Sequence, residues 1–262
     1  MPIKFTLKPG LVAYITCGDP DLDTSRDVAL AAIDGGADVI ELGVPFSDPV
    51  ADGPVIQRAS ERALRHGTDL HGVLGVARQI RRQSKAGLII FSYLNPVLQF
   101  GLDKFCAAAA EAGVDGALVT DLPVEEAGDY LRAMKAHKLA PVFLAAPTSA
   151  DKRLREVAKR SRGFIYAISR TGVTGTRQEL AADAQSLVTR LRKYSNLPIA
   201  VGFGISTPGQ FAEVGRFADA AVVGSAIVQR IEENAGREAP AVAEFLSSLT
   251  AAAQACRREQ SA

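Results

Sequence analysis

The sequence lacks tryptophan altogether and contains only three histidines and three cysteines among 262 residues. Cys17, Cys106 and Cys256 are too few and too widely spaced for a disulfide framework. No His-x-His pair or histidine–carboxylate cluster has the spacing of a metal site. We therefore expect a reduced, cytoplasmic protein that binds no metal.

Long apolar runs and a strong charge of either sign are also missing. No segment approaches the roughly 20 apolar residues that span a bilayer, and Pro9 and Gly10 interrupt the start of the chain before a secretory signal can form. The formal net charge is +1. Such a balance gives no reason to expect a nucleic acid or an anionic membrane as a partner.

The chain does contain eight short apolar runs that alternate with amphipathic stretches. The expected strands are 11–16, 38–42, 88–92, 116–120, 140–145, 164–168, 198–202 and 220–223. The expected helices between and after them include 24–34, 70–82, 102–112, 125–137, 150–160, 183–194 and 208–217. An alternation of strand and helix predicts parallel strands with the helices packed outside the sheet.

Eight such units in 262 residues have the size of a closed (β/α)8 TIM barrel, with a doubly wound open sheet as the alternative. Residues 16–20 form a turn after the first strand and not a dinucleotide-binding Gly-x-Gly-x-x-Gly loop. Glycines follow the seventh and eighth strands, where barrels often bind phosphate. We predict one barrel domain over 1–262, with its core at about 10–235, a C-terminal helix over 239–253 and a frayed tail.

A glutamate interrupts the second predicted strand. Side chains alternate along a strand, so Glu41 shares a face with Val39 and Gly43, whereas Ile40 and Leu42 suit packing against helices. Glu41 is then aimed into the barrel mouth, where lost solvation raises a carboxyl pKa and suits it to proton transfer. The alternative is a structural hydrogen bond or ion pair. We favour function because no Lys or Arg lies within a predicted strand.

The loop over 44–54 contains three prolines and one glycine, which hold a defined shape. It can carry Asp52 back over the mouth towards Glu41. The alternative for Asp52 is an ordinary Asp-Gly turn, and spacing alone leaves the two open. Asp48, which precedes Pro49, is interpreted as a turn residue.

Three loops at the same edge are rich in glycine. The segment from Ser169 to about Ala182 is long for a βα loop and is expected to be a lid, with a surface loop of no function as the alternative. The turns at 202–206 and 224–228 each lead into a helix and expose backbone N–H groups to an anion. Thr207 and Pro208 are a good N-cap and first helical residue. The alternative for both turns is geometry alone.

Other chemistry has little support. None of the nine lysines lies at a strand end, so a Schiff-base aldolase is disfavoured. His66, His71 and His137 fall on or beside helices, and Cys17 has no histidine in reach, so that we interpret it as a small buried filler. What remains is a phosphate-anchored barrel with carboxylates and a tyrosine, which fits proton transfer on a small sugar-phosphate-like substrate.

The segment over 41–54 closely resembles the second-strand segment of tryptophan synthase α subunits. It reads Glu-Leu-Gly-Val-Pro-Phe-Ser-Asp-Pro-Val-Ala-Asp-Gly-Pro. Further matches follow in the right order at 18–20, 93–96, 121–126, 147–149, 169–175, 202–205 and 224–228. The resemblance covers about residues 10 to 235, and a fourteen-residue motif with seven others in order is highly specific.

The resemblance implies a set of site residues. It assigns catalysis to Glu41 and Asp52 and substrate contact to Tyr166. Tyr14 stands where the family often has phenylalanine and is expected to stack on an indole ring. The remaining substrate-binding positions, mostly around the phosphate, are Tyr93, Thr174, Gly175, Phe203, Gly204, Gly224 and Ser225.

The resemblance also implies a reaction and a partner. The expected activity is retro-aldol cleavage of indole-3-glycerol phosphate to indole and glyceraldehyde 3-phosphate, with no cofactor in this subunit. The expected partner is a pyridoxal-phosphate-dependent tryptophan synthase β subunit in an α2β2 assembly, facing the loop over 45–52 and the lid. The alternatives are a standalone indole-releasing lyase, a non-catalytic barrel that binds the substrate and regulates a partner, and another sugar-phosphate barrel such as an isomerase.

Overall fold

A computed structural model describes residues 3–168, 177–202 and 204–260. The strands are β1 (Gly10–Thr16), β2 (Val39–Gly43), β3 (Gly87–Ser92), β4 (Gly116–Val119), β5 (Ala140–Val142), β6 (Leu144–Ala145), β7 (Ile165–Ile168), β8 (Ile199–Gly202) and β9 (Ala220–Val223). The helices are α1 (Leu22–Asp34), α2 (Pro54–Arg65), α3 (Leu70–Gln83), α4 (Leu94–Phe100), α5 (Leu102–Glu111), α6 (Gly128–Ala136), α7 (Asp151–Arg160), α8 (Arg177–Arg192), α9 (Pro208–Val214), α10 (Ser225–Glu233) and α11 (Glu238–Gln260).

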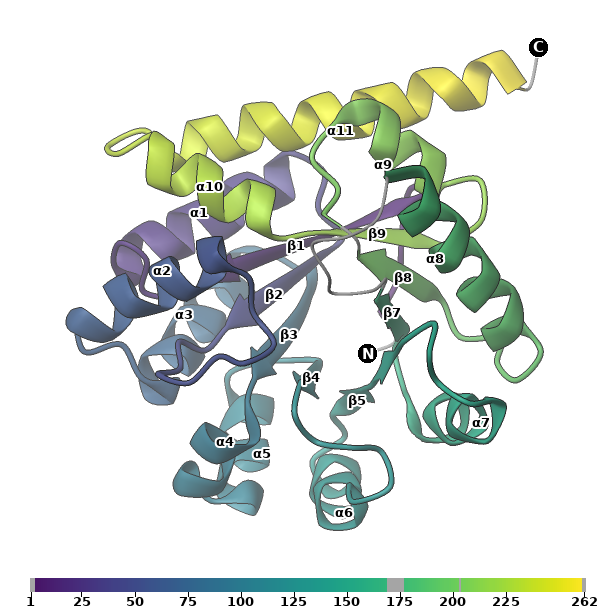
Figure 1. Cartoon of the computed structure of the whole chain (residues 1–262). Helices are drawn as coiled ribbons and strands as arrows, with labels where there is room; N and C mark the ends of the chain where they lie inside the picture. Colours follow the sequence, from purple (N-terminus) through teal and green to yellow (C-terminus); the bar gives the residue numbers. More distant parts are fainter. Residues whose placement is uncertain (1–2, 169–176, 203, 261–262) are drawn as a thin grey trace.

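The strands form a nearly closed parallel barrel. Their order is β5-β4-β3-β2-β1-β9-β8-β7-β6, and every pairing between neighbours is parallel. The helices surround the strands on the outside (Figure 1). The predicted TIM barrel is confirmed, and the open-sheet alternative is wrong because the first and last strands are neighbours within a ring.

The segment predicted as one strand over 140–145 is divided into two at Phe143. Its first part, β5, pairs with β4, and its second part, β6, pairs with β7. The Phe143 ring turns outward to meet Tyr130 of α6 edge-on at 6.2 Å, while the Phe143 carbonyl accepts a hydrogen bond from Tyr166 N–H at 3.2 Å. Nine strand segments therefore fill eight positions of the barrel.

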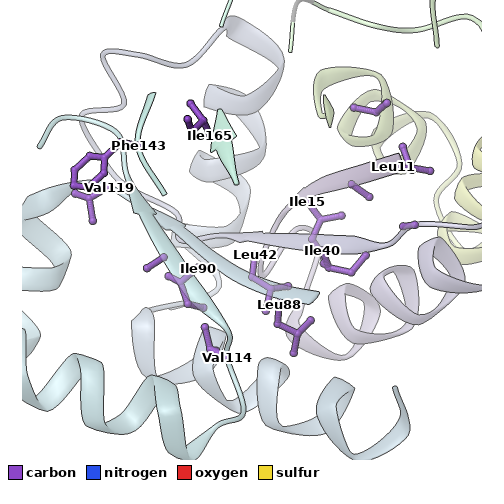
Figure 2. Packing of buried hydrophobic residues seen from close by; sticks show 14 of the residues in the cluster. Leu11, Ile15, Ile40, Leu42, Leu88, Ile90, Val114, Val119, Phe143 and Ile165 are labelled. Carbon is purple, nitrogen blue, oxygen red and sulfur yellow. The ribbon is translucent and has the colours of Figure 1, made fainter. Parts of the chain in front are cut away.

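Two apolar layers hold the fold together. The outer layer lies between strands and helices and includes Ile40 and Leu42, which Figure 2 shows beside Ile15 and Leu88. The inner layer fills the barrel, where Val39 belongs to one buried cluster with residues of six other strands and with Ile3 near the chain start. The predicted alternation along β2 is confirmed, so the next inward side chain above Val39 is that of Glu41.

The helices differ from the prediction in several places: α6 begins at Gly128 and not at 125, and α9 ends at Val214 and not at 217. Helices α2 and α4 were not predicted, α8 begins before residue 183, and α11 continues past residue 253 to Gln260. Helix α11 packs across α1, α9 and α10 (Figure 1), which explains its length. Within the described residues, no helix combines the length and apolar character that crossing a membrane requires.

Candidate active site

Glu41 lies on β2 inside the barrel, level with Tyr14 of β1 and Ile89 of β3. Its side chain is fully buried, and neither carboxyl oxygen has a hydrogen-bond partner among the described residues. Burial without a compensating partner disfavours the charged form and raises the pKa of Glu41 to about 8. At neutral pH the side chain is therefore mostly a protonated acid, ready to donate.

Asp52 is held over the barrel mouth by a tyrosine. The Tyr93 hydroxyl donates a hydrogen bond to Asp52 Oδ2 at 3.1 Å and accepts one from Ala51 N–H at 3.0 Å. Burial raises the pKa of Asp52 to about 6, with the Tyr93 hydrogen bond acting in the opposite direction. Asp52 is consequently ionised at neutral pH. Asp48 is exposed; its carboxyl accepts a hydrogen bond from the Ser47 hydroxyl and its carbonyl accepts one from Val50 N–H, as expected for a turn residue.

Two further tyrosines lie within the electrostatic reach of both acids. Burial, together with the charges of Asp52 and Glu41, raises the pKa of Tyr14 well above its usual value. The same two acids act on Tyr166, whose pKa is also raised, mainly by burial. Glu41 and Asp52 therefore both lie close to Tyr14 and Tyr166, near the carboxyl ends of the strands.

Aromatic rings pack beside these residues. Tyr14 meets Phe91 of β3 edge-on, with ring centroids 5.1 Å apart, and Tyr93 packs against Phe46 at 5.1 Å. Phe91 was not among the predicted site residues. Strand alternation could have found it, because it lies two positions beyond the inward-facing Ile89.

The glycine turns after the last two strands lie side by side, since β8 and β9 are paired. Gly204 has φ +76, a conformation that glycine adopts without strain, and Gly224 is the N-cap of α10, with Ser225 exposed at its first position. The first amides of a helix have no acceptor within it, so this turn offers N–H donors to an anion. A Cβ on Gly224 would come within 3.5 Å of Tyr14, which places the turn next to these aromatic rings.

The other predicted anion-site residues, Thr174, Gly175 and Phe203, lie outside the described residues, as does the first part of the expected lid. Thr207 caps α9 as predicted, in a reciprocal capping box with Gln210.

Metal ligation and thiol chemistry find no support in the described part of the chain. No group of three or more His, Cys, Asp or Glu side chains there is placed to hold a metal ion. Cys17 is fully buried, and burial raises the pKa of its thiol to about 12, so that it is an inert core residue as predicted. The arrangement as a whole offers a neutral proton donor, a carboxylate and flat apolar walls beside a turn that exposes amides.

Comparisons with known proteins agree with this geometry. A sequence model of the family described as "Tryptophan synthase alpha chain" matches residues 3–257. The tryptophan synthase alpha chain of Solibacter usitatus is 54% identical, with 95% of this chain and 92% of that protein covered. That of Geobacter sulfurreducens is 46% identical, with 94% of each covered. The crystal structure of tryptophan synthase subunit alpha from Legionella pneumophila superposes with a TM-score of 0.86 at 37% identity, covering 94% of this chain and 93% of that one.

Proposed function

The chain belongs to the tryptophan synthase alpha chain family, which acts in tryptophan biosynthesis, and we propose that it is a lyase that cleaves indole-3-glycerol phosphate into indole and glyceraldehyde 3-phosphate. One observation carries the proposal: Glu41, which is fully buried, has no hydrogen-bond partner among the described residues and is protonated at neutral pH, acts on the same two tyrosines as an ionised Asp52. Retro-aldol release of indole needs these two protonation states together.

The first step makes the indole ring a leaving group. Protonated Glu41 donates its proton to indole C3, so that the ring becomes a cationic indolenine with its charge shared by the ring nitrogen. The Asp52 carboxylate accepts a hydrogen bond from the indole N–H and stabilises that charge. Tyr93 holds Asp52 in place for this contact.

The second step breaks the carbon–carbon bond. The Glu41 carboxylate, which has just lost its proton, removes the proton of the substrate's carbinol hydroxyl. The oxygen's electron pair forms the aldehyde carbonyl, and the electrons of the breaking bond return to the ring and neutralise it. Glu41 finishes protonated, so the cycle consumes no net proton and calls for no cofactor in this subunit.

The turns after β8 and β9 hold the substrate from its other end. Gly204, Gly224 and Ser225 are proposed to bind the phosphate together with Thr174, Gly175 and Phe203. This binding energy is remote from the reacting bond and orients it between Glu41 and Asp52. Tyr14, Phe91 and Tyr166 are proposed to contact the indole and the connecting carbons.

We further propose that the chain works with a tryptophan synthase β subunit, in an α2β2 assembly that passes indole to it. The large apolar side chains exposed among the described residues are Val50, Leu64 and Leu98. A groove of about 430 Å³ next to Pro45 and Phe46 is bordered by Leu64 and by Asn95, Pro96, Gln99 and Phe100 of α4. Because this surface adjoins the loop that carries Asp52, a partner bound there can act on catalysis.

The direct test is incubation of the pure protein with indole-3-glycerol phosphate and detection of free indole and aldehyde. The parent protein is expected to release both, and addition of the β subunit to increase the rate. Glu41→Gln is expected to lower turnover by roughly 10²- to 10⁴-fold while substrate affinity is kept. Substrate binding without release of indole by the parent protein, alone or with the β subunit, would favour the non-catalytic alternative.

A further inference from the structure

An arginine on α2 forms a close ion pair with a buried aspartate from the loop after β1. Arg62 Nε lies 2.7 Å from Asp19 Oδ1, and Arg62 Nη2 lies 2.8 Å from Asp19 Oδ2. Asp19 is only 2% exposed. The two parallel hydrogen bonds fix the guanidinium plane, a geometry that lysine does not reproduce.

The same arginine reaches a third element of the fold. Arg62 Nη1 donates to Glu232 Oε1 of α10 at 2.7 Å. Glu232 also accepts hydrogen bonds from Arg58, one turn earlier on α2, at 3.2 and 2.9 Å. Arg58 and Arg62 hold the pKa of Glu232 below its usual value, so this carboxylate stays charged at neutral pH.

These ion pairs join the far ends of two helices whose near ends belong to the candidate site. Helix α2 begins at Pro54, two residues after Asp52, and α10 begins at Ser225 in the glycine turn. Beneath the ion pairs, Ala59 of α2 and Val228 of α10 are fully buried and cluster with Tyr14.

A helix is stiff along its axis, so the ion pairs at one end of α2 affect the position of its other end. Arg62 lies eight residues after Pro54, about 12 Å along α2 at 1.5 Å per residue. A change in the angle between α2 and α10 at this end therefore moves Asp52 relative to the Gly224–Ser225 turn at the other end. On α2 the apolar contact consists of the small Ala59 and of Val55 and Ile56, which are only partly buried, so the ion pairs add to a limited apolar contact.

We propose that Arg62 is a positioning residue that, through Asp19 and Glu232, sets the distance between Asp52 and the turn that binds the phosphate. The proposal rests on the proposed function only in taking that turn as the phosphate site. A ligand that spans both ends depends on their separation, whereas a ligand that occupies one end does not. Loss of the ion pairs of Arg62 should therefore weaken the binding of a ligand that joins an indole to a phosphate. The binding of indole alone or of a phosphate ligand alone should be unchanged.

The test measures Kd by calorimetry for indole, for glycerol 3-phosphate, and for an unreactive analogue that joins an indole to a phosphate through three carbons. For Arg62→Met we expect the linked analogue to lose affinity by about 10- to 100-fold. Each fragment should bind within about twofold of the parent, and Arg62→Lys should recover part of the affinity.

Arg62→Met leaves Asp19 buried without its partner, which can unfold the protein. Glu232→Gln is therefore the second variant, because it weakens only the link to α10 and leaves no buried charge unpaired. It should produce the same selective loss, to a smaller extent. Arg65→Met is the matched control: Arg65 lies on the same helix, is largely exposed, and among the described residues its ion-pair partner is Glu61, at 3.8 Å.

Two results would overturn the proposal. One is a fall in fragment binding that parallels the loss for the linked analogue, since this indicates general damage to the fold. The other is unchanged binding of the linked analogue by a folded Arg62→Met or Glu232→Gln variant. Because the ligands are not turned over, failure of the lyase assignment would appear separately, as absence of indole release from the true substrate.

Discussion

Two carboxyl groups of similar intrinsic acidity occupy different environments in this barrel. Glu41 is enclosed by strands and has no hydrogen-bond donor among the described residues, whereas Asp52 sits on a partly exposed loop and accepts one from Tyr93. The pKa values that result, about 8 and about 6, leave a window in which one group is an acid and the other a base.

This window predicts a bell-shaped dependence of kcat/KM on pH. Activity should rise as Asp52 ionises around pH 6, remain highest near pH 7, and fall as Glu41 loses its proton around pH 8. The measurement is initial indole release between pH 5 and pH 9.5 at low substrate concentration. Activity that keeps rising above pH 8 would contradict the assignment of Glu41 as the acid.

Tyr93→Phe should shift the acid side of that profile. The Tyr93 hydroxyl favours the ionised form of Asp52, so its removal should raise the pKa of Asp52 and move the lower limit of activity to higher pH. Hydrogen bonds to charged groups contribute roughly 1.5–3 kcal/mol, which corresponds to about one to two pKa units, so kcat/KM at pH 7 should fall by roughly 2- to 15-fold.

Tyr130→Phe is the matched control for this variant. Tyr130 is buried, and its hydroxyl donates to Ala117 O at 2.8 Å in the outer layer, away from the two acids. The control should lose some stability but keep the parent pH profile. An equal shift in both variants would show that the Tyr93 effect is not local.

The sequence supports some of these site residues better than others. Glu41 follows from alternation along a single strand, because a polar residue among apolar ones can point only inwards or outwards. The position of Asp52 cannot be predicted in this way, because it depends on a loop whose Asp-Gly turn has many possible shapes. The contact between Tyr93 and Asp52 joins residues 41 positions apart, and only their common place at the barrel mouth brings them together.

Elements were predicted best where burial alone determines them. The strands read as apolar runs because both of their faces are covered, and seven of the eight predicted runs correspond to single strands. The eighth is divided at Phe143, which depends on the long-range contact with Tyr130. Helix α2 was not predicted because the functional motif runs directly into it, although Pro54 is a typical first helical residue.

Helix α9 gives a test at the scale of one element. Thr207 and Gln210 form a capping box that satisfies backbone N–H groups at its start. Thr207→Ala should lower the free energy of unfolding by about 1 kcal/mol. For a chain of this size that is a fall of roughly 2–4 °C in Tm by calorimetry. Thr207→Ser, which keeps the cap, should melt close to the parent.

The whole molecule presents one apolar surface that the proposed function uses. Leu98 is 55% exposed on α4, beside the groove assigned to the β subunit. Leu98→Asp should leave the fold and the basal cleavage rate unchanged but weaken binding of the β subunit by at least tenfold, measured by calorimetry. Ser247→Asp, an exposed change on α11 at the other side of the barrel (Figure 1), is the control and should bind normally.

The divided strand at 140–145 has a consequence for how the barrel holds together. Three residue pairs join β4 to β5 and two join β6 to β7, whereas five join β1 to β2. Two pairs also join β8 to β9, but at the divided position the ring depends on the covalent chain through Phe143, since β5 pairs with β4 and β6 pairs with β7. We expect thermal opening of the barrel to begin at this position, three strands around the ring from Glu41, while β1, β2 and β3 stay paired.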